Sequence, residues 1–237
     1  MRIAAIIASS LALVTASTLM AATPAAAKTV KPQTANWAAR VTTSAMGGYI
    51  LGNPIAKNRM TEYVSYTCNH CAQFEREASA PLKTEFITKG NLNVEVRNYV
   101  RDPVDLTAAM LARCGGAAKF FGNHNLLMST QDSWMKSVQA ASPAVQKTWY
   151  DGSFADRMKR IASSAGFYGI MQKRGISKTA ANICLSDEAA RTKLMDMTKY
   201  GAETAKIEGT PSFVLNGKLT DAHSWAMLKP NLTLLAK

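Results

Sequence analysis

The chain has 237 residues, 47% of them hydrophobic, and a formal net charge of +12 at neutral pH. Its Lys and Arg residues are scattered, without a dense run or interleaved aromatic residues. We therefore interpret the charge as solubility or attraction to acidic surfaces, and expect no nucleic-acid partner. The four cysteines are too few to hold a chain of this length together as a small disulfide-rich domain.

The first 27 residues have the pattern of a secretory signal peptide. Arg2 supplies a positive charge, residues 3–20 form an apolar run, and small residues dominate 21–27. We expect cleavage after Ala27, with a site nearer Ala22 as the alternative. An uncleaved membrane anchor is disfavoured because the apolar run is short and diluted by Ser and Thr.

The stretch that follows the signal peptide is polar and alanine-rich. We predict a flexible N-terminal segment over residues 28–46, in which 41–43 can form a short edge strand. Glycines at 47–48 and the Gly-Asn-Pro sequence at 52–54 predict turns.

Residues 60–99 predict a strand, a helix and a second strand. The run 60–66 is β-prone, and apolar residues recur at every fourth position within 71–89, which predicts an amphipathic helix. Gly90 and Asn91 end that helix, and 92–99 alternates apolar and polar residues as a strand does.

The next hundred residues have helical patterns, punctuated by Ser, Asp, Gly and Pro. The predicted helices are Leu106–Arg113, Ala117–Gln131, Ser142–Tyr150, Asp156–Ala165, Tyr168–Arg174, Lys178–Leu185 and Asp187–Glu203. After Pro211, residues 212–216 and 218–219 predict a hairpin through Asn216–Gly217, and 221–229 predicts a final helix.

This order predicts an α/β fold, βαβ…ββα, interrupted by helices. A CxxC motif between the first strand and helix of such a unit indicates a thioredoxin-like redox site. We therefore predict a thioredoxin-like domain formed by residues 47–104 and 204–237, with an inserted helical domain at 105–203.

The motif Cys68–Asn69–His70–Cys71 lies where the predicted strand passes into the helix. A thiolate is the nucleophile in disulfide exchange, and the unpaired N–H groups at a helix start favour a negative charge there. We expect His70 to add a donor or a positive charge, so that the pKa of Cys68 falls, while Cys71 resolves mixed disulfides. An ordinary disulfide and a metal site are the alternatives. No second CxxC or HxxxH completes a metal-ligand set, so we predict no metal.

The Thr210–Pro211 pair supports the redox interpretation. A proline just before a strand is a candidate for a cis peptide bond. A cis bond would leave the backbone of Thr210 free to pair with a substrate strand beside the CxxC motif. The alternative is an ordinary trans proline that begins the strand.

The motif at 63–71, the segment Gly209–Gly217 and the helical insertion between them resemble the DsbA-like family of thioredoxin-fold oxidoreductases. With the Gly-Asn-Pro sequence at 52–54, the resemblance covers about residues 47–236. It implies that Cys68 is the nucleophile and Cys71 the resolving thiol, that His70 tunes the thiolate, and that Pro211 is cis and faces the disulfide. Strongly oxidising members usually carry proline where this chain has Asn69, which leaves oxidase and isomerase or reductase use both open.

Three further residues are candidates for a structural or catalytic role. Both Cys114 and Cys184 lie in the helical block, and we predict a structural disulfide between them; a second redox pair or free buried thiols are the alternatives. Glu62 is either a proton-transfer carboxylate near Cys71 or a solvent-facing strand residue.

The combined prediction is an exported, periplasmic thiol:disulfide oxidoreductase that needs no cofactor. As an oxidase it would donate its disulfide to reduced or unfolded exported proteins and be reoxidised by a membrane partner of the DsbB type, as the resemblance implies. Because 28–46 is too short for a dimerisation domain, we expect a monomer. A disulfide isomerase or reductase is the nearest alternative, and a non-catalytic metal- or peptide-binding module is the alternative from another class.

Overall fold

The computed structural model describes residues 36–235, in which six strands form one sheet in the order β1-β2-β4-β3-β5-β6. The strands are β1 (Val41–Thr43), β2 (Tyr49–Gly52), β3 (Asn58–Val64), β4 (Leu92–Asn98), β5 (Ser212–Leu215) and β6 (Lys218–Leu219). The neighbours β3 and β4 are parallel, and the other pairs are antiparallel. This mixed sheet confirms the predicted α/β fold.

The N-terminal part of the sheet differs from the prediction. The predicted signal peptide and residues 28–35 lie outside the described residues. Of the predicted flexible segment, Trp37–Ala39 forms a 3₁₀ turn and β1 pairs with β2, so flexibility is the wrong prediction for 36–46. The sequence analysis did find β1 but missed β2, whose glycine-rich flanks indicated only turns. Pairing of β2 with β4 makes it a strand.

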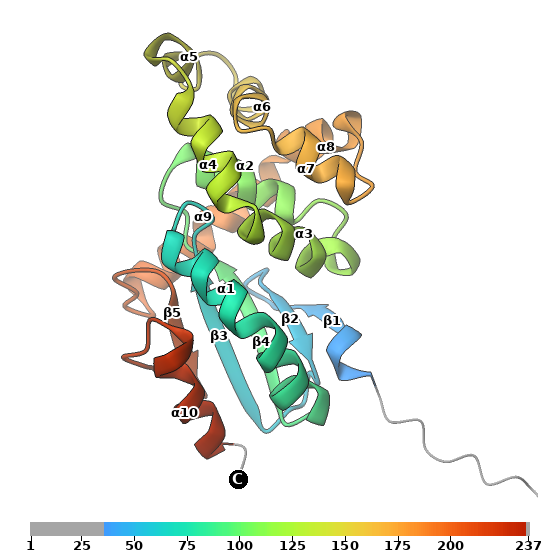
Figure 1. The fold of residues 1–237 in the computed structure, drawn as a ribbon, viewed down its shortest axis with the longest axis vertical. Helices are drawn as coiled ribbons and strands as arrows, with labels where there is room; N and C mark the ends of the chain where they lie inside the picture. Colours follow the sequence, from blue (N-terminus) through green and yellow to red (C-terminus); the bar gives the residue numbers. More distant parts are fainter. Residues whose placement is uncertain (1–35, 236–237) are drawn as a thin grey trace, which may run out of the picture. The chain divides into compact units, whose positions relative to one another are not determined.

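Helix α1 (Asn69–Pro81) covers one face of the sheet (Figure 1). It begins two residues before the predicted start, and its α-helical part ends at Pro81. A π turn (Leu82–Phe86) and a 3₁₀ turn (Ile87–Lys89) then continue it to Gly90, whose φ is 77°. Proline lacks the N–H that α-helical bonding requires, which accounts for the change of pitch.

Eight helices occupy the chain between β4 and β5 within the described residues. They are α2 (Pro103–Ala112), α3 (Ala117–Ser129), α4 (Gln131–Ala140), α5 (Pro143–Thr148), α6 (Phe154–Ser164), α7 (Phe167–Lys173), α8 (Lys178–Leu185) and α9 (Glu188–Glu203). The prediction ended one helix at Gln131 and assigned no helix to residues 132–141, so it missed α4. At Thr130 the backbone leaves the helical region, and the chain starts a new helix.

The C-terminal unit is a hairpin and a helix, as predicted, but the helix is displaced. Asn216 and Gly217 make the turn between β5 and β6 with φ values of 49° and 84°. Helix α10 spans Trp225–Leu235 rather than 221–229. Ser224 starts it, because its carbonyl and its hydroxyl accept the N–H groups at the helix N-terminus.

Two hydrophobic cores fill the molecule. One packs α1 and α10 against the sheet around Phe74 and Phe213. The other fills the helical segment and reaches the end of the sheet where α1 begins; helices α2–α8 lie beyond that end (Figure 1). Both Cys68 and Cys71 belong to this second core. The CxxC motif therefore lies at the junction of the sheet and the helical segment.

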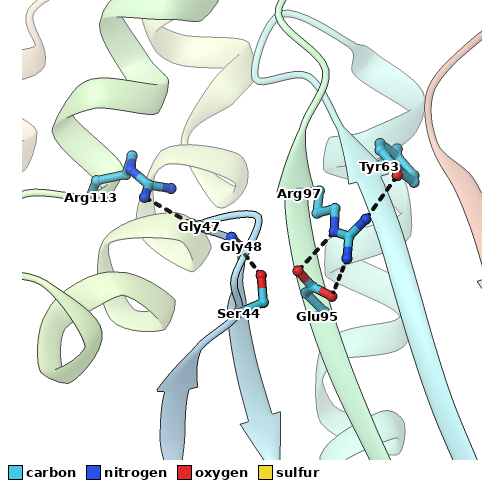
Figure 2. A network of polar contacts seen from close by, with 7 residues as sticks. All are labelled: Ser44, Gly47, Gly48, Tyr63, Glu95, Arg97 and Arg113. Atoms are coloured by element: carbon cyan, nitrogen blue, oxygen red, sulfur yellow. Dashed lines mark hydrogen bonds and ion pairs between the residues drawn. The ribbon is translucent and has the colours of Figure 1, made fainter. Parts of the chain in front are cut away.

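Covalent and polar links also hold the helical segment. The predicted disulfide between Cys114 and Cys184 is confirmed; it joins the end of α2 to α8 across 70 positions of sequence. Arg113 donates a hydrogen bond to the carbonyl of Gly47 at 2.8 Å, in the turn between β1 and β2 (Figure 2). Among residues 36–235, no helix has both the length and the apolarity that crossing a membrane requires.

Candidate active site

Cys68 is the residue at which β3 and its following turn pass into α1. It occupies the N-cap position, with extended backbone angles of −93° and 116°, and Asn69 begins the helix. Cys68 is 3% exposed and Cys71, one turn further on, is 1% exposed. Both cysteines are free thiols in this structure. The strand thus delivers Cys68 to the helix start, and the helical period puts Cys71 beneath it.

The environment of Cys68 favours its thiolate. The hydrogen bond from the Cys71 thiol lowers the pKa of Cys68 to about 5, although burial acts in the opposite direction. The Thr210 side chain and the positive charge of Arg101 lower it further. Cys71 is the reverse case, because burial and the neighbouring Cys68 raise its pKa well above the usual value. The two thiols therefore differ strongly in acidity, as a nucleophile and a resolving thiol should.

The Thr210–Pro211 bond is cis, as predicted, and it lies against Cys68. The Cys68 thiol donates to the Thr210 carbonyl at 3.1 Å. The Thr210 hydroxyl is buried without a hydrogen-bond partner among the described groups, so it is free to donate once Cys68 ionises. The Nδ1 atom of His223 lies 2.9 Å from the Pro211 carbonyl oxygen, and this contact holds the loop in place.

The other two residues of the motif, Asn69 and His70, are both exposed on the first turn of α1. The groups that lower the pKa of Cys68 are Cys71, Thr210 and Arg101, so the tuning role of His70 stays a prediction.

Glu62 lies on β3 beneath the motif, and the solvent-facing alternative for this residue is wrong. It is 3% exposed, and its charge raises the pKa of Cys71, so the two groups are neighbours. Burial, followed by the negative charge of Glu75, raises the pKa of Glu62 well above that of an ordinary carboxyl. A carboxyl of raised pKa next to a buried thiol is suited to proton transfer.

The helical segment holds the turn before Cys68 with side chains that the sequence analysis did not identify. Asp105 accepts the Tyr66 N–H at 2.7 Å. The Gln131 amide donates to the carbonyls of Tyr66 and Cys68, at 2.6 and 2.9 Å. Arg101 donates to the Thr67 carbonyl at 3.1 Å. No local sequence pattern marks these three residues. The Asp-Pro sequence at 102–103, which begins α2, is the one local signal near them, because it is typical of a helix start.

A hollow of about 730 Å³ lies on the sheet face that α1 does not cover. Figure 2 shows its central contact, in which Arg97 makes two 2.8 Å hydrogen bonds to Glu95 and one of 3.2 Å to the Tyr63 hydroxyl. These charges neutralise each other, and none of the four cysteines lines the hollow. Elsewhere in 36–235, His, Cys, Asp and Glu side chains form no group of three able to hold a metal ion. The chemistry of the described residues is therefore centred on Cys68 and Cys71.

Residues 44–232 match a family model described as thioredoxin. Curated relatives include proteins named "Putative protein-disulfide oxidoreductase" in Rickettsia typhi and Rickettsia conorii. Each is 29% identical over 176 residues, which is 74% of this chain but 57% and 55% of the relative. The chain thus spans little more than half the length of these relatives.

Solved structures give the same placement. The crystal structure of protein-disulfide isomerase from Novosphingobium aromaticivorans is 39% identical, with a TM-score of 0.76, over 79% of this chain and 97% of that one. Wolbachia pipientis alpha-DsbA1 is 21% identical, with a TM-score of 0.60, over 81% of this chain and 92% of that one. The second likeness shows that the fold, including its helical insertion, is of the DsbA-like type.

Proposed function

The chain belongs to the thioredoxin family, and from that premise we propose that it is a protein-disulfide oxidoreductase that introduces disulfides into reduced exported proteins. One observation carries the proposal. A cysteine with a pKa of about 5 lies at a helix start, against a cis Thr210–Pro211 bond and directly above a buried thiol of raised pKa. The low pKa makes Cys68 the better leaving group in disulfide exchange.

The reaction begins from the Cys68–Cys71 disulfide. A substrate thiolate attacks the Cys68 sulfur, a mixed disulfide forms, and the electron pair of the broken bond goes to the Cys71 sulfur. Glu62 is next to Cys71 and its pKa is raised, so it is the group placed to protonate the leaving thiolate. A second substrate thiolate then attacks the substrate sulfur of the mixed disulfide. The substrate disulfide forms, and Cys68 leaves as a stable thiolate.

The low pKa of Cys68 favours the oxidase direction. A stabilised thiolate favours the reduced enzyme, so the oxidised enzyme gives up its disulfide more readily. The predicted signal peptide supports a periplasmic location, where reduced exported chains are the substrates. A membrane protein of the DsbB type would restore the disulfide, and the chain would act as a monomer.

Isomerase activity is the second candidate, favoured by the name of the 39% identical Novosphingobium structure and by Asn69 in place of proline. Two assays separate the candidates. An oxidase, supplied as the oxidised enzyme, restores the native disulfides of a reduced multi-cysteine protein. An isomerase restores the native disulfides of the same protein when those disulfides have been scrambled.

The decisive variant is Cys68→Ser, which we expect to abolish both activities, with Cys71→Ser trapping mixed disulfides. The Cys114→Ala/Cys184→Ala variant is the matched control, because it removes two cysteines and leaves the CxxC motif intact. Full thiol exchange by Cys68→Ser would refute the proposed function. Rescue of scrambled protein without oxidation of reduced protein would leave the isomerase candidate in its place.

A further inference from the structure

The hollow of about 730 Å³ has a floor made of sheet side chains. Arg59, Thr61 and Tyr63 of β3 all line it, because alternate residues of a strand point to the same face. Their span of four residue steps is about 13 Å, the length of about four residues of an extended chain. Among the described helices only α9 contributes to the lining, through Tyr200 at the Tyr63 end. The rest of this sheet face is left open to a partner.

The hollow has an excess of positive charge. Its charged lining consists of Lys57, Arg59, Arg97 and Glu95, so three cations face one carboxylate. Arg97 engages Glu95 through two hydrogen bonds of 2.8 Å (Figure 2). Lys57 and Arg59 are both exposed, and neither forms an ion pair with a carboxylate of residues 36–235. Two cations at one end of the hollow are therefore available to an anionic partner.

The opposite end of the hollow offers a buried hydrogen-bond donor. The Tyr63 hydroxyl accepts a hydrogen bond of 3.2 Å from Arg97, so its own proton is left to donate. Among the described residues it forms no other hydrogen bond, although Tyr63 is 1% exposed. Beside it, the Tyr200 ring lies 5.7 Å from the Arg97 guanidinium and is 37% exposed. This end therefore suits a partner that supplies a carbonyl oxygen and an apolar side chain.

Apolar side chains lie between and beside these polar groups. Val214 of β5 lines the hollow next to Thr61, its partner in register. Leu219 of β6 pairs with Val214 and is 45% exposed at the rim, and Ile50 of β2 lines the other side. Small-molecule pockets are lined mainly by apolar groups, whereas this lining mixes cations, hydroxyls and apolar side chains. Such a mixed lining suits a polypeptide with acidic and apolar side chains.

We propose that this hollow binds an extended, acidic peptide segment of an unfolded exported protein. Carboxylates of the segment lie at Lys57 and Arg59, a backbone carbonyl accepts from the Tyr63 hydroxyl, and an apolar side chain packs against Leu219. The formal net charge of +12 attracts acidic segments from a distance. This inference rests on the proposed function, which supplies unfolded exported chains as partners.

The site is separate from the redox pair, because neither Cys68 nor Cys71 lines the hollow. A segment bound there leaves the CxxC motif free for disulfide exchange. Because the bound segment and the client's cysteines belong to one chain, binding raises the concentration of those cysteines around the enzyme. The hollow therefore favours clients with acidic segments without taking part in the chemistry.

The test is isothermal titration calorimetry of the reduced protein with two cysteine-free peptides of eight residues. One contains four glutamates among tyrosines and serines, and the other has glutamine at the same four places. The main variant is Lys57→Gln/Arg59→Gln. Its matched control is Arg76→Gln/Lys136→Gln, which removes the same two charges from exposed sites on α1 and α4. A third variant, Thr61→Tyr, fills the middle of the floor and keeps both cations.

We expect the protein to bind the glutamate peptide at least about tenfold more tightly than the glutamine peptide in about 50 mM salt. Lys57→Gln/Arg59→Gln weakens binding of the glutamate peptide about tenfold, because each exposed ion pair contributes a few-fold. Arg76→Gln/Lys136→Gln stays within about twofold of wild type, since charges that far from the peptide are screened. Thr61→Tyr weakens binding about fivefold, because the new ring occupies the place of the peptide.

Equal affinity for the two peptides would overturn the inference, and so would equal losses in the two double variants, which would show an effect of overall charge alone. Displacement of the glutamate peptide by the same concentration of N-acetylglutamate would assign the hollow to small organic anions and would also overturn it. Circular dichroism verifies folding, and the exposed double variants decide the outcome where Thr61→Tyr does not fold. Because the peptides carry no thiol, failure of the oxidase proposal appears only in the refolding assay.

Discussion

The acidity of Cys68 gives a quantitative prediction, which is tested by varying pH on the reduced protein. Its folded pKa of about 5 lies below the value of about 8.5 for a free cysteine in an unfolded chain. A group whose pKa is lowered on folding adds stability that is complete above its unfolded pKa and disappears as the pH falls through its folded pKa. The contribution of Cys68 to the free energy of unfolding of the reduced protein should therefore rise with pH between about 5 and 8.5.

The magnitude at pH 7 follows from the distance between pH 7 and the folded pKa. Two pH units correspond to about 2.7 kcal/mol, or about 60 mV of redox potential for a two-electron couple. That is an upper limit, because solvent near the active site screens the charge; about half of it should remain. The oxidised protein has no thiol at Cys68 and lacks this contribution.

Two measurements test the reasoning. Absorbance of the thiolate near 240 nm should titrate with a midpoint near pH 5, and it should vanish in Cys68→Ser. Urea unfolding of the reduced and oxidised proteins should show a stability difference that shifts toward the reduced form as the pH rises from 5 to 8. A thiolate midpoint above pH 8, or a difference that stays constant with pH, would refute the reasoning.

Three other predictions concern stability. Replacing both Cys114 and Cys184 by Ala should lower the free energy of unfolding by up to about 4 kcal/mol, measured in urea, because the link closes a loop of 70 positions. Gln131→Ala leaves two buried carbonyls of the active-site turn unpaired and should cost about 1–3 kcal/mol, whereas Gln146→Ala, with one carbonyl partner, should cost less. Burial raises the pKa of Asp105 to about 7, so the folded protein binds the extra proton. The contribution of Asp105 to stability should therefore fall between about pH 4 and 7, and the difference in stability between wild type and Asp105→Asn should follow that slope.

Each of these has a contrary outcome. Unchanged unfolding of the double alanine variant would mean that the unfolded chain does not gain freedom when the link is lost. Equal costs at 131 and 146 would show that the turn before Cys68 does not depend on the α4 amide. A difference between wild type and Asp105→Asn that stays constant with pH would assign the slope to another group.

Much of the active site was predictable because it is encoded locally. A β-prone run, a CxxC motif and an apolar period of four predict a strand that ends shortly before Cys68 and a helix that buries Cys71. The proline before a strand pointed to the cis bond at 210–211. Each of these signals comes from neighbouring residues, where backbone geometry and side-chain period act directly.

Element boundaries were less predictable, since weak local signals compete there. Glycines around β2 indicated turns, and only pairing with β4 made that stretch a strand. The predicted helix ended at Gln131, whereas the backbone leaves the helical region at Thr130 and a new helix spans Gln131–Ala140.

By itself, the sequence determined the redox pair and its place at the start of a helix. Only the tertiary structure decided which distant side chains serve that pair. Gln131 meets the Cys68 carbonyl from 63 positions away, and His124 meets the Tyr66 hydroxyl from 58. Chain connectivity carries no information about such contacts, because they exist only once the helical segment packs against the end of the sheet.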